Sequence, residues 1–308
     1  MEADIVELDG QIGLWPSSAG YALGYAEPMY HRGLVAVGGR LEESLSVSGA
    51  KLLVPPSTPA HFRGHIREAS QAFDEGHAAH QLLLGVGAPI EPIPFDDWRT
   101  KAAREAADAA RAAGCIPLKT DQYERVCGMA DALSAHETAS DLLTGRGWPE
   151  VSMWAPDGDI GVWLRGRADY INFDAHLIVD YKTTASPAHP EGAAKTIWKF
   201  HYEMQAAWYI DLAQTVGLDV DGFVFVFQEK APPYAVSVVR LDDAAMETGR
   251  AENAAAIRLY AACIETDTWP GYADQIETIA LPRWATAAWT PDIGLYARLE
   301  DLIKEMET

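Results

Sequence analysis

The hydrophobic and polar positions in the first half of the chain follow the helical period. Residues 70–85 carry apolar side chains near one stripe, which predicts an amphipathic helix. Residues 96–113 and 121–144 are rich in alanine and show the same periodicity, with Asp97 and Thr120 as the expected N-caps. The opening 60 residues are rich in glycine, proline and serine, so they predict an irregular arm with short elements.

The pattern changes between residues 150 and 184, where β-branched and aromatic residues predominate. Turn residues at 156–158 divide a predicted hairpin, 151–156 and 160–171, and a further strand is expected at 176–184. Strands flanked by helices predict an α/β domain around a mixed sheet. The remaining predicted elements are a helix at 199–216, strands at 221–230 and 234–241, and helices at 242–267 and 292–306.

The composition is that of a globular protein with a sizeable core. Hydrophobic residues make up 48% and charged residues 22% of the 308 residues. No apolar run approaches the roughly 20 residues that span a bilayer, and the acidic N-terminus lacks the features of a signal peptide. We therefore expect a cytoplasmic protein without membrane partners. The three cysteines, Cys115, Cys127 and Cys263, form no C-x-x-C pair, which argues against a disulfide framework or a zinc ribbon.

The formal net charge is −21, from 24 basic and 45 acidic residues. A protein surface that binds nucleic acid nonspecifically needs clustered lysine and arginine, so this charge argues against such a binder. A nuclease, however, needs only a local positive rim and a bound cation. The charge therefore leaves a nuclease possible while excluding a generally basic DNA-coating protein.

The candidate chemistry lies at the ends of two adjacent predicted strands, at Asp169 and at Asp180-x-Lys182. Alternate residues of a strand face the same side, so Asp180 and Lys182 should project together while Tyr181 faces the opposite layer. If Asp169 pairs near Asp180, two carboxylates meet, and a divalent cation relieves their repulsion. Oxygen ligands suit Mg²⁺ or Mn²⁺. The alternative is a surface ion pair without catalytic meaning.

This arrangement resembles the D…(D/E)-x-K signature of the PD-(D/E)XK nuclease superfamily. Gly76-x-x-x-His80 resembles the histidine motif of its RecB-like and RecE-like members, and Gln205-x-x-x-Tyr209 resembles their Q-x-x-x-Y motif. The runs at residues 45–53 and 57–62 are similar to the lead-in of phage RecE-type (exonuclease VIII-like) proteins. The resemblance extends from about Tyr30 to about Gln228. It implies a PD-(D/E)XK core with a central mixed sheet flanked by helices and an N-terminal helical portion.

The resemblance also implies roles for individual residues. Lys182 would position the attacking water, and Glu150 would bind or assist a metal near Asp169. The implied ligands of Mg²⁺, for which Mn²⁺ should substitute, are His80, with His77 in reserve, Asp169, Asp180 and the Tyr181 carbonyl. The expected DNA contacts are Gln205, Tyr209, Arg165, Arg167 and Lys199, with Trp198 as a stacking or core residue. The resemblance implies that Gln205 and Tyr209 contact either the DNA backbone or the catalytic strand. For His80, Glu150, Gln205 and Tyr209 an ordinary structural role is the alternative.

The function implied by the resemblance is exonucleolytic digestion of linear double-stranded DNA, 5′ to 3′, to expose single strands for recombination. Family members form rings and pass their product to a single-strand annealing protein of the RecT type, and both features are expected here. The alternatives are an endonuclease, a RecB-like repair nuclease and a silent protein that binds DNA ends. We expect an arm at residues 1–65 and a nuclease domain at 66–308.

Overall fold

The computed structural model describes residues 3–8, 11–37, 40–65 and 71–281. It divides into two units, residues 1–270 and 271–308, and the first contains all the described helices and strands. Within the described residues no helix is both long enough and apolar enough to cross a membrane. The helix expected at 292–306 lies outside the described residues.

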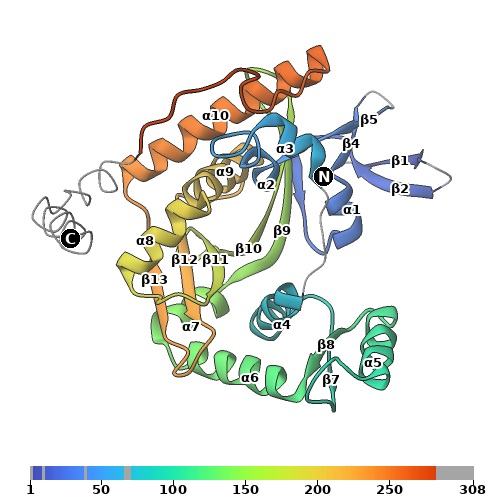
Figure 1. Cartoon of the computed structure of the whole chain (residues 1–308), viewed down its shortest axis with the longest axis vertical. Coiled ribbons are helices and arrows are strands. Elements are labelled where there is room, and N and C mark those ends of the chain that lie inside the picture. The colour runs from blue at the N-terminus through green and yellow to red at the C-terminus, as the bar shows by residue number, and fades with distance from the viewer. Residues whose placement is uncertain (1–2, 9–10, 38–39, 66–70, 282–308) are drawn as a thin grey trace, which may run out of the picture. The chain divides into compact units, whose positions relative to one another are not determined.

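A seven-stranded mixed sheet forms the centre of the first unit, with the strand order β13-β12-β11-β10-β9-β3 and with β6 paired to β10 (Figure 1). The β11–β12 and β6–β10 pairs are parallel, and the other pairs are antiparallel. The strands of this sheet are β3 (Gly20–Ala22), β6 (Leu45–Ser46), β9 (Gly147–Pro156), β10 (Trp163–Asn172), β11 (Leu177–Thr184), β12 (Gly222–Glu229) and β13 (Val236–Val239). The predicted α/β class and mixed sheet are confirmed.

Helices cover both faces of the sheet, as Figure 1 shows for α9 and α10 on one side and for α6 and α7 on the other. The helices are α1 (Glu27–Arg32), α2 (Val47–Ala50), α3 (Pro59–Gly64), α4 (Gln71–Leu84), α5 (Lys101–Ala112), α6 (Thr120–Ser134), α7 (Glu137–Thr144), α8 (Pro190–Lys199), α9 (Tyr202–Thr215) and α10 (Asp243–Thr266). Three two-stranded sheets pair β1 (Ala3–Leu8) with β2 (Gln11–Pro16), β4 (Leu34–Val37) with β5 (Arg40–Glu43), and β7 (Ile90–Ile93) with β8 (Ile116–Lys119).

The two faces of the sheet have separate cores. In β12, Phe223, Phe225 and Phe227 pack into the core that contains α8, α9 and α10, while Val224 and Val226 pack into the core that contains α4, α6 and α7. The almost continuous apolar run of β12 follows from burial on both faces. Tyr181 of β11 lies in the second core, as its predicted opposite orientation requires.

Three predicted helix boundaries were wrong. The helix expected from residue 96 begins at Lys101, because Thr100 rather than Asp97 accepts the Ala103 N–H as N-cap. The helix expected at 121–144 is two helices, and the imidazole of His136 caps the second one.

The third error concerns α8, which the prediction of a single helix at 199–216 missed. His189 followed by Pro190 gave a local signal for its start, because proline favours the first turn of a helix. The chain turns between α8 and α9 at His201, whose φ of 50° lies in the left-handed region. The predicted arm is also less separate than expected, since β3 and β6 belong to the main sheet. The division at residue 65 stays a prediction.

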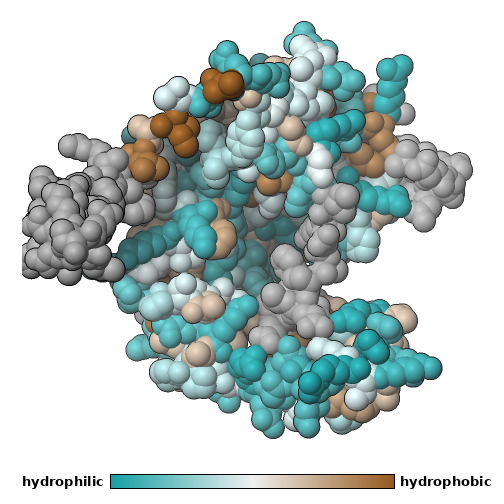
Figure 2. Space-filling model, viewed as in Figure 1, coloured by the Kyte–Doolittle hydropathy of each residue, from teal (hydrophilic) through white to brown (hydrophobic). Residues whose placement is uncertain are grey.

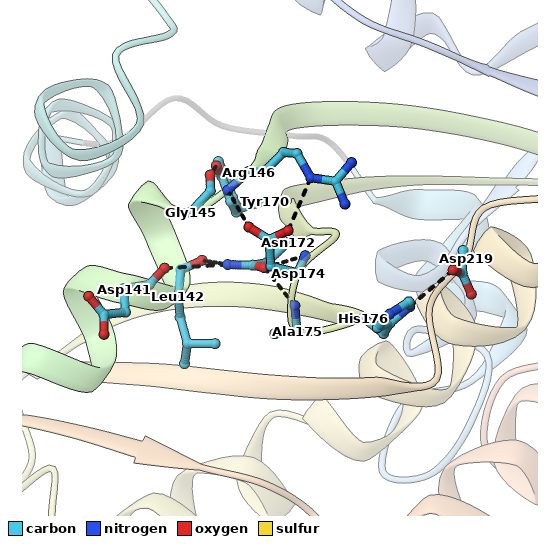
Figure 3. Close-up of polar contacts among 10 residues, drawn as sticks. All are labelled: Asp141, Leu142, Gly145, Arg146, Tyr170, Asn172, Asp174, Ala175, His176 and Asp219. Atoms are coloured by element: carbon cyan, nitrogen blue, oxygen red, sulfur yellow. Dashed lines mark hydrogen bonds and ion pairs between the residues drawn. The ribbon is translucent and has the colours of Figure 1, made fainter.

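The turn between β10 and β11 fixes the register of this hairpin (Figure 3). The side-chain oxygen Oδ1 of Asn172 accepts hydrogen bonds from the N–H groups of Asp174 and Ala175 at 3.0 and 2.9 Å, and its side-chain amide donates to the Leu142 carbonyl at 2.9 Å. The side chain of Asn172 is thus held on both sides, and the residue is only 3% exposed. Because a shift of one residue would turn every side chain to the other face, this turn decides where the hairpin's acids point.

Substitution of Asn172 with alanine should lower the free energy of unfolding by about 2–4 kcal/mol, because the side chain makes four hydrogen bonds and each contributes about 0.5–1.5 kcal/mol. Urea unfolding followed by circular dichroism measures the effect. Asp174→Asn is the matched control, since Asp174 pairs with Arg146 on the surface and such exposed pairs contribute little to stability. Equal losses in the two variants would show that the Asn172 amide does not hold the turn.

Candidate active site

Strand β11 presents Asp180 and Lys182 on the face that α9 covers. Asp180 is fully buried, and its Oδ2 atom forms an ion pair with the Lys182 ammonium. Its other oxygen, Oδ1, accepts a hydrogen bond from the Gln205 amide of α9. A fully buried carboxylate is stable only when it is paired and hydrogen-bonded, so these two contacts fix both the charge and the orientation of Asp180.

A second group of potential ligands lies on the neighbouring elements. One donor atom each from His80 of α4, Glu150 of β9 and Asp169 of β10 lie within 4.8 Å of one another. His80 Nε2 is 3.7 Å from Asp169 Oδ2 and 3.1 Å from the Tyr181 carbonyl oxygen. The Tyr181 N–H donates to Asp169 Oδ2 at 2.9 Å, which ties this group to the strand that carries Asp180.

Strand pairing explains why these acids meet. The register of β9 and β10 pairs Ala168 with Val151 and Tyr170 with Pro149, so Asp169 falls opposite Glu150. The register of β10 and β11 pairs Tyr170 with Val179, so Asp169 is also next to Asp180. Glu150 has a φ of 50°, which marks a local irregularity of β9 at this point. Three strands therefore bring one carboxylate each to the same stretch of the sheet.

The donor set suits a divalent cation. Two carboxylates, one imidazole and a backbone carbonyl converge, and carboxylate and carbonyl oxygens are the ligands that Mg²⁺ and Mn²⁺ prefer. Figure 2 shows that the visible face of the first unit is hollowed near its centre and that hydrophilic residues line part of the hollow. The residues therefore fit a metal site, with Asp180 beside it and paired with Lys182.

Comparison with protein families identifies the domain. Residues 47–282 match the model of the PDDEXK-like domain of unknown function (DUF3799). The chain belongs to this family. No curated protein matches its sequence significantly.

Two solved structures are similar to this PDDEXK-like domain. One, a protein from Eubacterium rectale provisionally named an exonuclease, has a TM-score of 0.53 and 13% identity over 78% of this chain and 91% of its own. The other is a phage-related exonuclease from Haemophilus somnus 129PT, with a TM-score of 0.33 and 12% identity over 73% of this chain and 96% of its own. At 13% identity, the similarity to the Eubacterium rectale protein shows a shared fold only. The TM-score of the Haemophilus somnus protein is too low to support a conclusion.

The buried acids of the PDDEXK-like domain have raised pKa values in the absence of a metal. Burial and the nearby Asp169 carboxylate raise the pKa of Glu150 to about 7. Burial also raises the pKa of Asp180 to about 6, although the Lys182 ammonium opposes this shift. Burial alone would lower the pKa of Lys182, but Asp180 and Asp169 outweigh it and raise that pKa above its usual value. Lys182 therefore stays a cation throughout the physiological range.

The raised pKa of Glu150 predicts a pH-dependent stability of the metal-free domain. A carboxyl whose pKa is higher in the folded state stabilises the fold fully below pH 4.5, and this contribution is lost as the pH rises through about 7. Glu150→Gln removes the titration, so this variant should exceed the unaltered chain in unfolding free energy above pH 7. A shift from 4.5 to about 7 sets an upper limit of about 3 kcal/mol, and the partial exposure of the side chain reduces it to about 1–2 kcal/mol.

Urea unfolding in EDTA at pH 5 and at pH 8.5 measures this difference. Glu247→Gln on the exposed side of α10 is the matched control and should show no pH-dependent gain. A difference between Glu150→Gln and the unaltered chain that is the same at both pH values would contradict the assignment.

Lys51 is a residue near the site that the sequence analysis did not single out. It follows α2, and its Nζ lies 4.8 Å from the centre of the Tyr202 ring, while Lys182 Nζ lies 5.1 Å from the same centre. Burial, and then the Lys182 charge, lower the pKa of Lys51 to about 7. The only sequence signal was its place in the run at residues 45–53, where the family resemblance begins.

The residues predicted to contact DNA occupy different environments. Lys199 is exposed at the end of α8, and Trp198 beside it is 66% exposed, so a core role for Trp198 is wrong. Gln205 contacts Asp180 of the catalytic strand, one of the two roles that the resemblance implied. Tyr209 is only 9% exposed and packs against Gly166 of β10.

The two predicted arginines are engaged inside the molecule. Arg165 contacts Ser44, and Arg167 donates to Ser152 Oγ and to the Tyr25 carbonyl, each at 2.8 Å. Arg167 Nε is also 3.9 Å from Glu150 Oε2. Their roles in DNA binding, like that of Tyr209, stay predictions. The structure describes only the backbone of α4 around the reserve ligand His77, whose side chain lies outside the described part.

Proposed function

We propose that this chain is a metal-dependent DNA exonuclease that digests linear double-stranded DNA, from 5′ to 3′, to expose single strands for recombination. The observation that carries the proposal is the set of Asp180, Lys182 and Gln205 beside the group of His80, Glu150 and Asp169. The membership in a PDDEXK-like family and the fold shared with a protein named an exonuclease support a nuclease activity.

Each side chain of the site would have a different role in phosphodiester hydrolysis. His80, Glu150 and Asp169, with Asp180 and the Tyr181 carbonyl, would hold Mg²⁺, for which Mn²⁺ should substitute. When bound, such an ion acts as a Lewis acid at the phosphate and lowers the pKa of a water molecule. The Lys182 ammonium offsets negative charge that develops on the phosphate oxygens and orients the attacking water. Gln205 keeps the Asp180 carboxylate in place through its hydrogen bond.

The DNA contacts and partners follow from the same proposal. Lys199 is the exposed cation of the predicted set and would bind the phosphate backbone, which needs no base recognition. Assembly into a ring and transfer of the product to a single-strand annealing protein of the RecT type belong to the proposal as well.

Linear duplex DNA with one labelled end, and closed circular DNA, test the activity in Mg²⁺, Mn²⁺ or EDTA. We expect loss of the linear substrate alone, no loss in EDTA, and early release of a 5′ label rather than a 3′ label. Nicking of the circle would support an endonuclease instead. Binding of ends without loss in either metal would support a silent DNA-end-binding protein.

A further inference from the structure

A second group of metal-ligating side chains lies where α8, α9 and α10 meet. It consists of His201, Glu203 and Glu252, whose donor atoms lie within 4.8 Å of one another. His201 Nδ1 is 3.3 Å from Glu203 Oε1 and 3.5 Å from Glu252 Oε2. His201 immediately precedes α9, Glu203 lies in its first turn, and Glu252 comes from α10.

Glu203 is the unusual member of this group. The residue is 3% exposed, and as long as Glu203 and Glu252 are both ionised, neither carboxylate oxygen of Glu203 accepts a hydrogen bond from another of the described residues. The His201 imidazole is its nearest ion-pair partner. A buried carboxylate without hydrogen bonds carries a large desolvation cost, and Glu252 adds the repulsion of a second carboxylate. Both costs disappear when a cation binds between the side chains.

Close packing of the two helices holds the carboxylates together. Gly249 of α10 lies against the Glu203 carbonyl so tightly that a Cβ atom there would come within 2.2 Å of the carbonyl oxygen. The Asn253 amide donates to the Met204 carbonyl at 2.9 Å, one turn further along α10. Glu252 lies between these two contacts in sequence, so α10 cannot withdraw it from Glu203 without losing both.

We propose that His201, Glu203 and Glu252 bind a divalent transition-metal ion, Mn²⁺ or Zn²⁺, at a site separate from the one at His80. Adjacent ligands of an ion with bonds of 2.0–2.2 Å are about 3–3.5 Å apart in tetrahedral or octahedral geometry, which matches the two distances from His201 Nδ1. An imidazole with two carboxylates suits Mn²⁺ and Zn²⁺ better than Mg²⁺. Three protein ligands leave the remaining positions to water.

The site would join the start of α9 to α10. Residues two apart on a helix do not face the same side, so the Glu203 side chain lies near Glu252 of α10 while Gln205 faces β11. A bound ion would therefore fix the position of the helix that holds Asp180 without entering the hydrolytic site. This inference does not depend on the proposed exonuclease activity.

Isothermal titration of the full chain with MnCl₂ and with ZnCl₂ tests the proposal. The background variant His80→Ala/Asp169→Asn removes two ligands of the first site. We expect this variant still to bind one ion, at the site of His201, Glu203 and Glu252. Addition of Glu252→Gln should weaken that binding at least about a hundredfold. Glu247→Gln, on an exposed position of the same helix, is the matched control and should leave it unchanged.

A second variant distinguishes the loss of a metal ligand from misfolding. His201→Asn keeps a residue type that tolerates the left-handed backbone found there, and it should also remove the ion while circular dichroism stays unchanged. In the His80→Ala/Asp169→Asn background, both ions should raise the melting temperature when Glu247→Gln is added but not when Glu252→Gln is added. Equal binding by these two variants, or a dissociation constant above about 1 mM in the background variant, would overturn the proposal. A proton shared between Glu203 and Glu252 would then account for the cluster.

Discussion

Asparagine in place of Asp180 should reduce DNA cleavage at least about a thousandfold while the fold is retained. Asparagine has the same shape, and its oxygen can still accept the Gln205 hydrogen bond. It lacks the negative charge that pairs with Lys182 and that a metal ion would need. Single-turnover hydrolysis of end-labelled duplex DNA in Mg²⁺ measures the rate, and titration with Mn²⁺ should show weaker binding.

Asp174→Asn provides the matched control for this experiment. Asp174 is exposed, lies just beyond the C-terminal end of β10 and pairs with Arg146 on the surface (Figure 3). The control should cleave at the rate of the unaltered chain. Turnover by Asp180→Asn at more than about a tenth of the normal rate would remove Asp180 from the site.

Lys182→Met should lower the rate of the chemical step by about 10²–10⁴-fold while the affinity for Mn²⁺ changes little. Methionine replaces the volume of the aliphatic stem, so the change mainly removes the ammonium. Without it the pKa of Asp180 should rise further, because Lys182 opposes the effect of burial. The assay is therefore run over a series of alkaline pH values, which separates protonation of Asp180 from loss of the ammonium.

Lys101→Met is suited as the control for Lys182, because Lys101 is an exposed residue of α5 paired with Glu105 on the surface. Single-turnover rates and Mn²⁺ titrations for the two variants separate chemistry from binding. A parallel loss of rate and metal affinity in Lys182→Met would assign Lys182 to metal binding. An unchanged cleavage rate would show that the ion pair between Lys182 and Asp180 has only a structural role.

The sequence predicted well what depends on neighbouring residues. Alternation in β9, β10 and β11 gave the hairpin and the shared face of Asp180 and Lys182, because strand periodicity is a local property. Strands β3 and β6 were missed because they contain only three and two residues, and their pairing is determined by distant partners. The break between α8 and α9 was missed because residues on both sides of it favour helix.

The polar contacts of the site depend on tertiary structure, so the sequence alone did not predict them. The contact of Gln205 with Asp180 joins residues 25 positions apart, and His80 reaches the Tyr181 carbonyl across 101 positions. No periodicity of the sequence specifies such distances. Lys51 and Glu252 escaped the sequence analysis for the same reason, since each is informative only through its burial or its partner from another helix.

The hydrogen bond from Gln205 to Asp180 has a consequence for the order of events during translation. Asp169, Asp180 and Lys182 leave the ribosome before α9, and a domain generally folds as a unit. A nascent chain that ends before Gln205 thus contains the acids and the lysine but not the amide that orients Asp180. Truncated products of interrupted synthesis should therefore be poor nucleases.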